Sequence, residues 1–243
     1  MRAALMYHSI DRSSSPISVD PETFRRHVRW LASGAVRVVP LAQLMSDGSG
    51  DAVALTFDDG FANFESEAAP LLAEHGLPAT LFVVTGHVGR ANDWGGRGQR
   101  HVPTLPLLGW DSLGKLAGSG IEIGAHTRTH RPLDELSDDE IEDELGSSSR
   151  EIEARTGRRP STFAYPYGRT SPVAVAAARG HFAISCTTEL RACGASEDPA
   201  RLPRLDAYYL RAPGRLERWG SGELARYLWV RAHARRVRRT FAR

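Results

Sequence analysis

The chain has 243 residues, with 31 lysines and arginines against 29 aspartates and glutamates, and 41% of its residues are hydrophobic. These values are ordinary for a soluble globular protein, and the length suits one sizeable domain whose core needs no disulfides. The two cysteines, Cys186 and Cys193, match no zinc or redox spacing, so they are expected to be free thiols.

Short apolar runs typical of β-strands alternate along the chain with amphipathic segments typical of helices. The strand-like runs are 3–7, 36–39, 53–57, 79–84, 121–124, 162–165 and 182–185. Asp20 should cap a helix that begins at Pro21, and Ser137 with Glu140 forms a capping box for a long helix that stops near Gly157. Alternation of this kind predicts parallel strands joined by right-handed crossovers, in an α/β fold of the incomplete, distorted barrel type.

Two polar motifs each follow a strand-like run. Asp58 and Asp59 follow the run 53–57, and His126 and His130 follow the run 121–124. Either motif alone is commonplace, because Asp-Asp-Gly is a frequent turn and a histidine pair four residues apart is often a surface pair. Together they supply two imidazoles and a carboxylate, a ligand set that leaves a metal an open position, while the second carboxylate is available as a base. We therefore predict a catalytic metal site at the ends of these strands.

Four segments occur in the order typical of one enzyme family. They are 55–60, 78–83, 126–130 and 163–168. In these segments the chain resembles the polysaccharide deacetylase family, also called the NodB-homology family or carbohydrate esterase family 4. The resemblance implies a NodB-like, distorted and incomplete (β/α) barrel of about seven parallel strands. It also implies a metal-dependent hydrolase that removes N-acetyl groups from an N-acetylhexosamine-containing glycan or glycan precursor.

The resemblance assigns a role to each motif residue. Asp58 corresponds to the general base, and Asp59, His126 and His130 correspond to the ligands of a divalent metal, usually Zn²⁺, with Co²⁺ and Ni²⁺ as alternatives. Tyr167 corresponds to a residue whose backbone N–H helps to bind the oxyanion.

Two features of the family pattern are missing from this chain. Ala164 stands where the commonest motif has an arginine, and no Leu-x-His motif follows Cys186. The segment 5–10 resembles the opening of a permuted branch that includes the poly-N-acetylglucosamine deacetylases, in which a histidine on the first strand replaces the late one. This resemblance implies that His8 is the general acid. Arg204 is our candidate for the orienting role of the missing arginine, although an arginine in such a position is more often on the surface.

Two other functions stay open. The departures at Ala164 and after Cys186 fit a non-catalytic carbohydrate-binding protein that retains the fold, whereas the complete ligand set favours an enzyme. A deacylase or deformylase of a lipid-linked amino sugar would carry the same motifs.

Three aromatic residues are candidates for stacking on sugar rings or for the core: Trp94, Trp110 and Tyr165. The glycine-rich segment 86–98 is expected to be a loop, either a substrate flap or an inert one.

We divide the chain into a catalytic domain, residues 1–222, and a basic tail, residues 223–243. The tail contains seven arginines and one glutamate, and Val230, Ala234, Val237 and Phe241 recur at helical spacing. This pattern predicts a basic amphipathic helix, which could contact an anionic membrane, bind a partner or an acidic glycan, or remain solvated. No nucleic-acid partner is expected, because the remainder of the chain is acidic and lacks a recognition motif.

The start of the chain bears on its location. The apolar run after Met1 is too short for a signal peptide, and no run reaches the length of a membrane span. We therefore expect a cytoplasmic protein, with peripheral contact at the inner membrane face as the role open to the tail.

Overall fold

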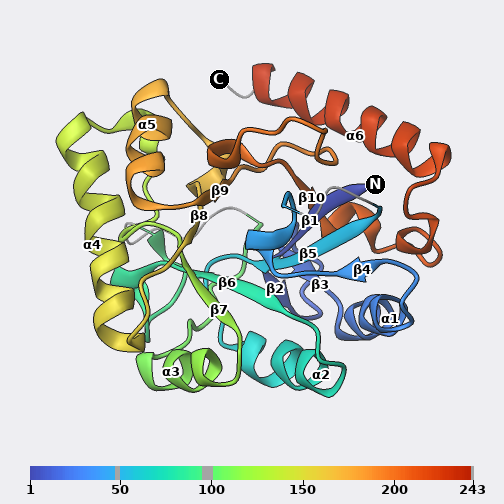
Figure 1. Cartoon of the computed structure of the whole chain (residues 1–243), viewed down its shortest axis with the longest axis horizontal. Coiled ribbons are helices and arrows are strands. Elements are labelled where there is room, and N and C mark those ends of the chain that lie inside the picture. The colour runs from blue at the N-terminus through green and yellow to red at the C-terminus, as the bar shows by residue number, and fades with distance from the viewer. Residues whose placement is uncertain (47–49, 95–100, 242–243) are drawn as a thin grey trace.

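The chain forms a ring of parallel strands surrounded by helices (Figure 1). The structure is a computed structural model that describes residues 1–46, 50–94 and 101–241, with side chains up to Val237. The strands lie in the order β10 (Arg204–Asp206), β1 (Arg2–Tyr7), β5 (Ala52–Phe57), β6 (Ala79–Val83), β7 (Glu122–Ala125), β8 (Thr162–Ala164) and β9 (Ile184–Cys186). An isolated bridge between Cys186 and Leu202 links the two ends of this order. The architecture is therefore a nearly closed barrel of seven parallel strands, as the sequence predicted.

One strand of the barrel differs from the sequence prediction. The run 36–39 yields only the short β4 (Arg37–Val38), which pairs with the start of β5 and lies outside the order given above. Its place in the barrel is taken by β10, which was absent from the predicted runs because its three residues include an arginine and an aspartate. A second small sheet consists of β2 (Ser9–Ile10) and β3 (Ser18–Val19).

The helices lie outside the ring of strands (Figure 1). They are α1 (Pro21–Ala32), α2 (Ala69–Glu74), α3 (Trp110–Gly118), α4 (Asp138–Thr156), α5 (Pro172–His181) and α6 (Gly222–Phe241). The caps are those predicted: Asp20 accepts hydrogen bonds at the start of α1, Ser137 and Glu140 form the capping box of α4, and Gly157 ends α4 in a left-handed conformation. In the described part of the chain, no helix combines the length and the apolar character needed to cross a bilayer.

Strand register brings the functional motifs to one rim. Tyr7 pairs with Phe57, and Val83 pairs with Ala125. The strands are parallel and buried along their length, so the residues that follow them emerge together at the carboxyl end of the barrel. His8, Asp58 and His126 each come directly after one of these strands, and this is why they meet.

Gly124, two residues before His126, is a sensitive packing position in β7. A Cβ atom at this position would lie 2.5 Å from Cδ1 of Phe82 and 2.7 Å from Oγ1 of Thr162, and both side chains are fully buried. We expect Gly124→Ala to lower the free energy of unfolding by about 1–3 kcal/mol, as overpacking does. Gly114→Ala in α3 is the matched control, because a Cβ there meets no atom within 4 Å. Urea unfolding followed by circular dichroism measures both variants, and equal stability of the two would contradict the packing argument.

Candidate metal centre and active site

Three side chains converge at the rim of the barrel. Oδ1 of Asp59 lies 3.3 Å from Nε2 of His126 and 3.4 Å from Nε2 of His130. All three residues are buried, and this Oδ1 atom has no hydrogen-bond partner among the residues that the structure describes. The set predicted from the two sequence motifs is therefore assembled in space.

The geometry of this set fits a cation. Ligands at about 2.0–2.1 Å from a tetrahedral zinc ion lie ~3.3 Å from one another, close to the separations of the Asp59 oxygen from the two imidazole nitrogens. A buried carboxylate oxygen without a hydrogen bond is costly, and a positive ion among the three atoms would remove that cost. Oxygen and imidazole donors together suit a divalent metal of the zinc type.

The outer nitrogen of each imidazole is also engaged. Nδ1 of His126 donates to the backbone carbonyl of Ala164 at 2.6 Å, so its Nε2 lone pair points into the site. Nδ1 of His130 lies 3.2 Å from the hydroxyl of Tyr167. Such contacts hold a histidine in the orientation and tautomer that metal binding needs. Tyr167 thus contributes its side chain to the site, a contact that the sequence motif did not predict.

Glu144 of α4 holds the segment between the two histidines. Its Oε2 atom accepts hydrogen bonds from the backbone N–H groups of Arg128 at 2.8 Å and Thr129 at 2.9 Å, and Oε1 accepts one from the Thr129 hydroxyl. Glu144 is buried, so its carboxylate is committed to this segment. Glu144 could not be predicted from the sequence, because one glutamate among several acidic residues of a helix carries no distinguishing signal.

The backbone around the site is strained. Left-handed backbone conformations, with φ between 60° and 73°, occur at Asp59, Thr127, His130 and Tyr167. Non-glycine residues rarely adopt this region, and it costs free energy that the surrounding hydrogen bonds must offset. Such a concentration at one rim is typical of a site held in a functional geometry.

Asp58 forms a buried ion pair with Arg204. The guanidinium donates from Nη1 to Oδ1 at 2.6 Å and from Nη2 to Oδ2 at 2.7 Å. Arg204 is completely buried, so the surface alternative is wrong, and its Nε donates to the carbonyl of Thr187 at 3.0 Å. This contact is the one that an orienting arginine would make, although the catalytic role itself stays a prediction.

Burial and charge compete in setting the pKa values at the site. Burial raises the pKa of Asp58, but Arg204 and the neighbouring imidazoles outweigh it, and the pKa lies below its ordinary value. Burial is likewise outweighed at Asp59, whose pKa lies well below its usual range because His126 and His130 favour the ionised form. Burial lowers the pKa of His130, which keeps that imidazole neutral, whereas the two carboxylates raise the pKa of His126 despite its burial. Both aspartates are therefore anionic at neutral pH.

A cavity of about 90 Å³ opens beside these groups, and its size suits a small substituent rather than a whole sugar ring. Its lining includes His8, Asp58, Asp59, His126, His130, Tyr167 and Trp94. Nε2 of His8 lies 3.9 Å from Oδ2 of Asp58, and His8 is partly exposed. Every sequence-predicted site residue except Arg204, which lies behind Asp58, thus faces one cavity.

The aromatic candidates differ in position. Trp94 stacks on His130 with ring centroids 4.4 Å apart. Tyr165 is fully buried and donates to the carbonyl of Ala200, so it cannot stack on a sugar, and Trp110 packs against the core. Residues 95–98 of the predicted loop lie outside the described residues.

The barrel and its rim of carboxylates and histidines define an α/β protein of the NodB-like fold. A family model described as polysaccharide deacetylase matches residues 46–181, and the chain belongs to this family. IcaB from Ammonifex degensii has the same fold, since it superimposes with a TM-score of 0.73 at 22% identity, covering 93% of this chain and 96% of that one.

Two curated relatives share recognisable sequence. The Bacillus subtilis protein YxkH is 28% identical over 192 residues, which is 76% of this chain and 63% of YxkH. A Staphylococcus aureus poly-beta-1,6-N-acetyl-D-glucosamine N-deacetylase is 24% identical over 178 residues, or 68% of this chain and 58% of that protein. The chain therefore spans about six tenths of the length of these relatives.

Glu144 offers a test of how the metal centre is held. We expect Glu144→Ala to weaken Zn²⁺ binding by about 10–100-fold, because the backbone N–H groups of Arg128 and Thr129 then lose the acceptor that fixes the histidine segment. Glu153→Ala, on the exposed face of the same helix, is the control, and His126→Ala should lose the metal. Competition with a chromophoric chelator measures the affinities. Unchanged affinity in Glu144→Ala would show that the segment is held by other contacts.

Proposed function

We propose that this chain is a metal-dependent N-deacetylase that acts on an N-acetylhexosamine-containing glycan or glycan precursor. The observation that carries the proposal is the convergence of Asp59, His126 and His130 beside the Asp58–Arg204 ion pair. Family membership supports the reaction type, and the relative named as a poly-beta-1,6-N-acetyl-D-glucosamine N-deacetylase supports an N-acetylglucosamine unit.

Hydrolysis of an amide needs an activated water, stabilisation of negative charge and a proton for the leaving amine. A divalent cation held by Asp59, His126 and His130, with zinc as our first choice, would supply Lewis-acid polarisation of the carbonyl and acidify water. Asp58 is ionised and accepts the proton of the attacking water. Arg204 holds both carboxylate oxygens of Asp58, which fixes the direction of that proton transfer.

His8 is our candidate for the general acid, the group that donates a proton. It lies on the accessible side of the cavity, within 3.9 Å of Asp58, where it can donate a proton to the departing sugar nitrogen. The backbone N–H of Tyr167 is our candidate for binding the oxyanion, supported by the position of Tyr167 in the cavity wall. The volume of about 90 Å³ matches an acetyl group and its immediate neighbours.

Acetate release tests the proposal directly. The metal-loaded protein is incubated with N-acetylglucosamine oligomers and with N-formylated analogues, and acetate and formate are measured. Acetate release supports the N-deacetylase, whereas formate release alone would assign the alternative deformylase. Binding of the oligomers without release of either acid would assign a carbohydrate-binding protein.

Asp58→Asn is expected to lower kcat by roughly 10²–10⁴-fold with metal content unchanged, because an amide cannot accept the proton of water. The substitution also leaves the buried charge of Arg204 unpaired, so rates are normalised to the folded fraction measured by circular dichroism. Near wild-type turnover would rule out Asp58 as the base.

His8→Ala is expected to lower kcat sharply for an amide, whose leaving amine needs a proton. The loss should be smaller on an activated acetyl ester, whose leaving group needs none. Both substrates are assayed together with metal content. Equal losses on the two substrates, or loss of the metal, would point to a structural histidine or a further ligand instead.

We also propose that the outer face of α6 contacts an anionic membrane. Leu224 and Leu228 pack into the core, whereas Val230 and Val237 are 51% and 55% exposed. Both are among the five large apolar side chains that are exposed in the described residues. Exposed arginines lie between them, and apolar side chains with interspersed cations suit an anionic lipid surface.

Replacing Arg226 and Arg231 of this face by glutamine should weaken association with phosphatidylglycerol vesicles at low salt by about 30-fold. Each arginine near such a surface contributes about 1 kcal/mol. Arg158→Gln with Arg159→Gln, on an exposed loop elsewhere, is the matched control. Vesicle sedimentation measures the partition. If the unaltered protein ignores these vesicles, the membrane contact is excluded.

A further inference from the structure

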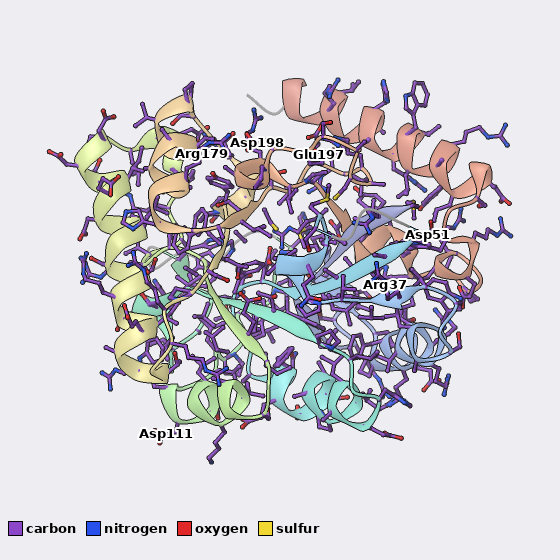
Figure 2. The ribbon with its side chains drawn as sticks, in the orientation of Figure 1. Arg37, Asp51, Asp111, Arg179, Glu197 and Asp198 are labelled. Atoms are coloured by element: carbon purple, nitrogen blue, oxygen red, sulfur yellow. The ribbon has the colours of Figure 1, made fainter. Side chains whose placement is uncertain are left out.

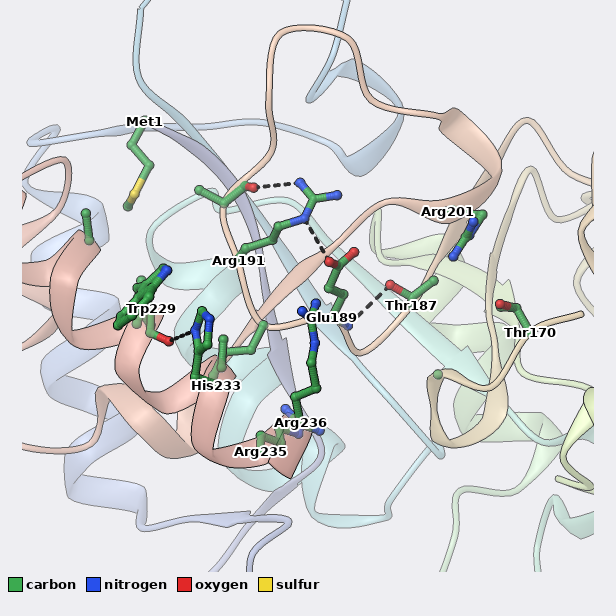
Figure 3. Close-up of a pocket in the computed structure, with 16 residues that line it drawn as sticks. Met1, Thr170, Thr187, Glu189, Arg191, Arg201, Trp229, His233, Arg235 and Arg236 are labelled. Atoms are coloured by element: carbon green, nitrogen blue, oxygen red, sulfur yellow. Dashed lines mark hydrogen bonds and ion pairs between the residues drawn. The ribbon is translucent and has the colours of Figure 1, made fainter. Parts of the chain in front are cut away.

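A groove separates α6 from the segment that follows β9. Its volume is about 610 Å³, and Figure 3 shows the side chains that line it. The lining includes Leu190, Leu228, Ala225 and Ala232, so much of the groove wall is aliphatic. This groove is separate from the cavity that contains the metal ligands and is much larger.

The polar part of the groove is dominated by cations. Four arginines, Arg191, Arg201, Arg235 and Arg236, line it together with one carboxylate, that of Glu189. Arg236 extends from α6 toward Glu189 in Figure 3. Two of these arginines are already paired, Arg235 with Asp206 and Arg191 with Glu189 and Glu197. Arg201 is exposed, and its guanidinium has no ion-pair or hydrogen-bond partner within the described part of the chain. A guanidinium in this state can receive an anionic acceptor from outside the chain.

The wall opposite α6 is held by ion pairs. Nη2 of Arg191 donates to Oε2 of Glu197 at 3.0 Å, and Nη2 of Arg179 on α5 donates to Oδ2 of Asp198 at 2.6 Å. Figure 2 shows Arg179, Glu197 and Asp198 together at this edge of the molecule. The groove is therefore bounded on one side by a helix and on the other by a braced segment, rather than by a free loop.

The groove and the catalytic cavity share a thin partition. Gly168 and Thr187 line the groove, whereas their neighbours Tyr167 and Thr188 line the cavity. The hydroxyl of Thr188 donates to the carbonyl of Tyr167 at 3.1 Å, which joins the two sides of the partition. A substrate could therefore present a sugar to the cavity while a part attached to that sugar occupies the groove.

We propose that the groove binds a phosphate ester that carries an apolar chain, the lipid-phosphate part of a lipid-linked amino sugar. Arg201 pairs with the phosphate oxygens, and the aliphatic wall covers the first isoprenoid or methylene units of the chain. A nucleotide fits less well, because Trp229, the indole in the groove, already packs against the His233 ring, with 3.9 Å between ring centroids. This inference rests on the proposed deacetylase function and names its substrate class.

Isothermal titration of the full chain with farnesyl phosphate below its aggregation concentration tests the site. Farnesol, inorganic phosphate and UDP-N-acetylglucosamine are titrated in parallel. Farnesyl phosphate should bind at least about tenfold more tightly than each of the other three, since only it satisfies both Arg201 and the apolar wall. Equal binding of farnesol and farnesyl phosphate, tighter binding of the nucleotide, or no binding of farnesyl phosphate would each overturn the proposal.

Two matched variants locate the binding. Ala232→Phe fills the groove and should weaken farnesyl phosphate binding by about tenfold or more, whereas Ala234→Phe, on the exposed side of α6, should not. Arg201→Gln should cost roughly tenfold, the loss of one charge-assisted hydrogen bond. Circular dichroism confirms folding of each variant. Equal affinities in Ala232→Phe and Ala234→Phe would place the ligand elsewhere.

Acetate release separates this inference from the proposed function. Release from N-acetylglucosamine oligomers without farnesyl phosphate binding would overturn the groove assignment and leave the deacetylase intact. Farnesyl phosphate binding without acetate release from any N-acetylated substrate would overturn the deacetylase and the substrate class that depends on it.

Discussion

The buried ion pair between Asp58 and Arg204 links the closing edge of the barrel to the rim that carries the candidate metal centre. Arg204 lies on β10, and it also donates to the carbonyl of Thr187 and the hydroxyl of Thr56 on β5. Two charges removed from water are costly unless every lone pair and proton finds a partner, and here the bidentate geometry with two further acceptors meets that condition. The contacts of Arg204 thus join β10 to β5 and to the segment after β9, and its charge also keeps the Asp58 carboxylate ionised.

The same rim stores strain that other contacts offset. Left-handed backbone at Asp59 and His130 aims their side chains at a common point, a geometry that relaxed loops would not keep. Glu144 offsets part of this cost by accepting backbone N–H groups from the histidine segment, and the carbonyl of Ala164 fixes His126. Ala164 is where the common family motif has an arginine. In this chain a guanidinium reaches Asp58 from β10, and we propose that Arg204 takes the orienting role of that arginine.

Site residues could be predicted from the sequence where carboxylates and imidazoles directly follow apolar strand-like runs. Asp58, Asp59, His126 and His130 each follow an apolar strand, and parallel register alone is enough to bring such residues together. The burial of a polar side chain could not be predicted where it depends on a partner far away in the sequence. Arg204 has the sequence appearance of a surface residue and becomes core only because Asp58 meets it, and β10 is too short and too polar to display a strand pattern. Glu144 could not be predicted either, because the sequence does not distinguish it from the other acidic residues of its helix.

The tail illustrates the limit of periodicity. Val230, Ala234 and Val237 were correctly seen to share a helical stripe, yet these three are exposed, and the helix packs through Leu224 and Leu228. A repeat of apolar residues identifies a face but does not say what covers it, because burial also depends on the shape of the surface beneath. With its other side closing a cationic groove beside the candidate active site, α6 presents two chemically different faces. A lipid-phosphate substrate would engage both at once, with its phosphate in the groove and its membrane against the outer face.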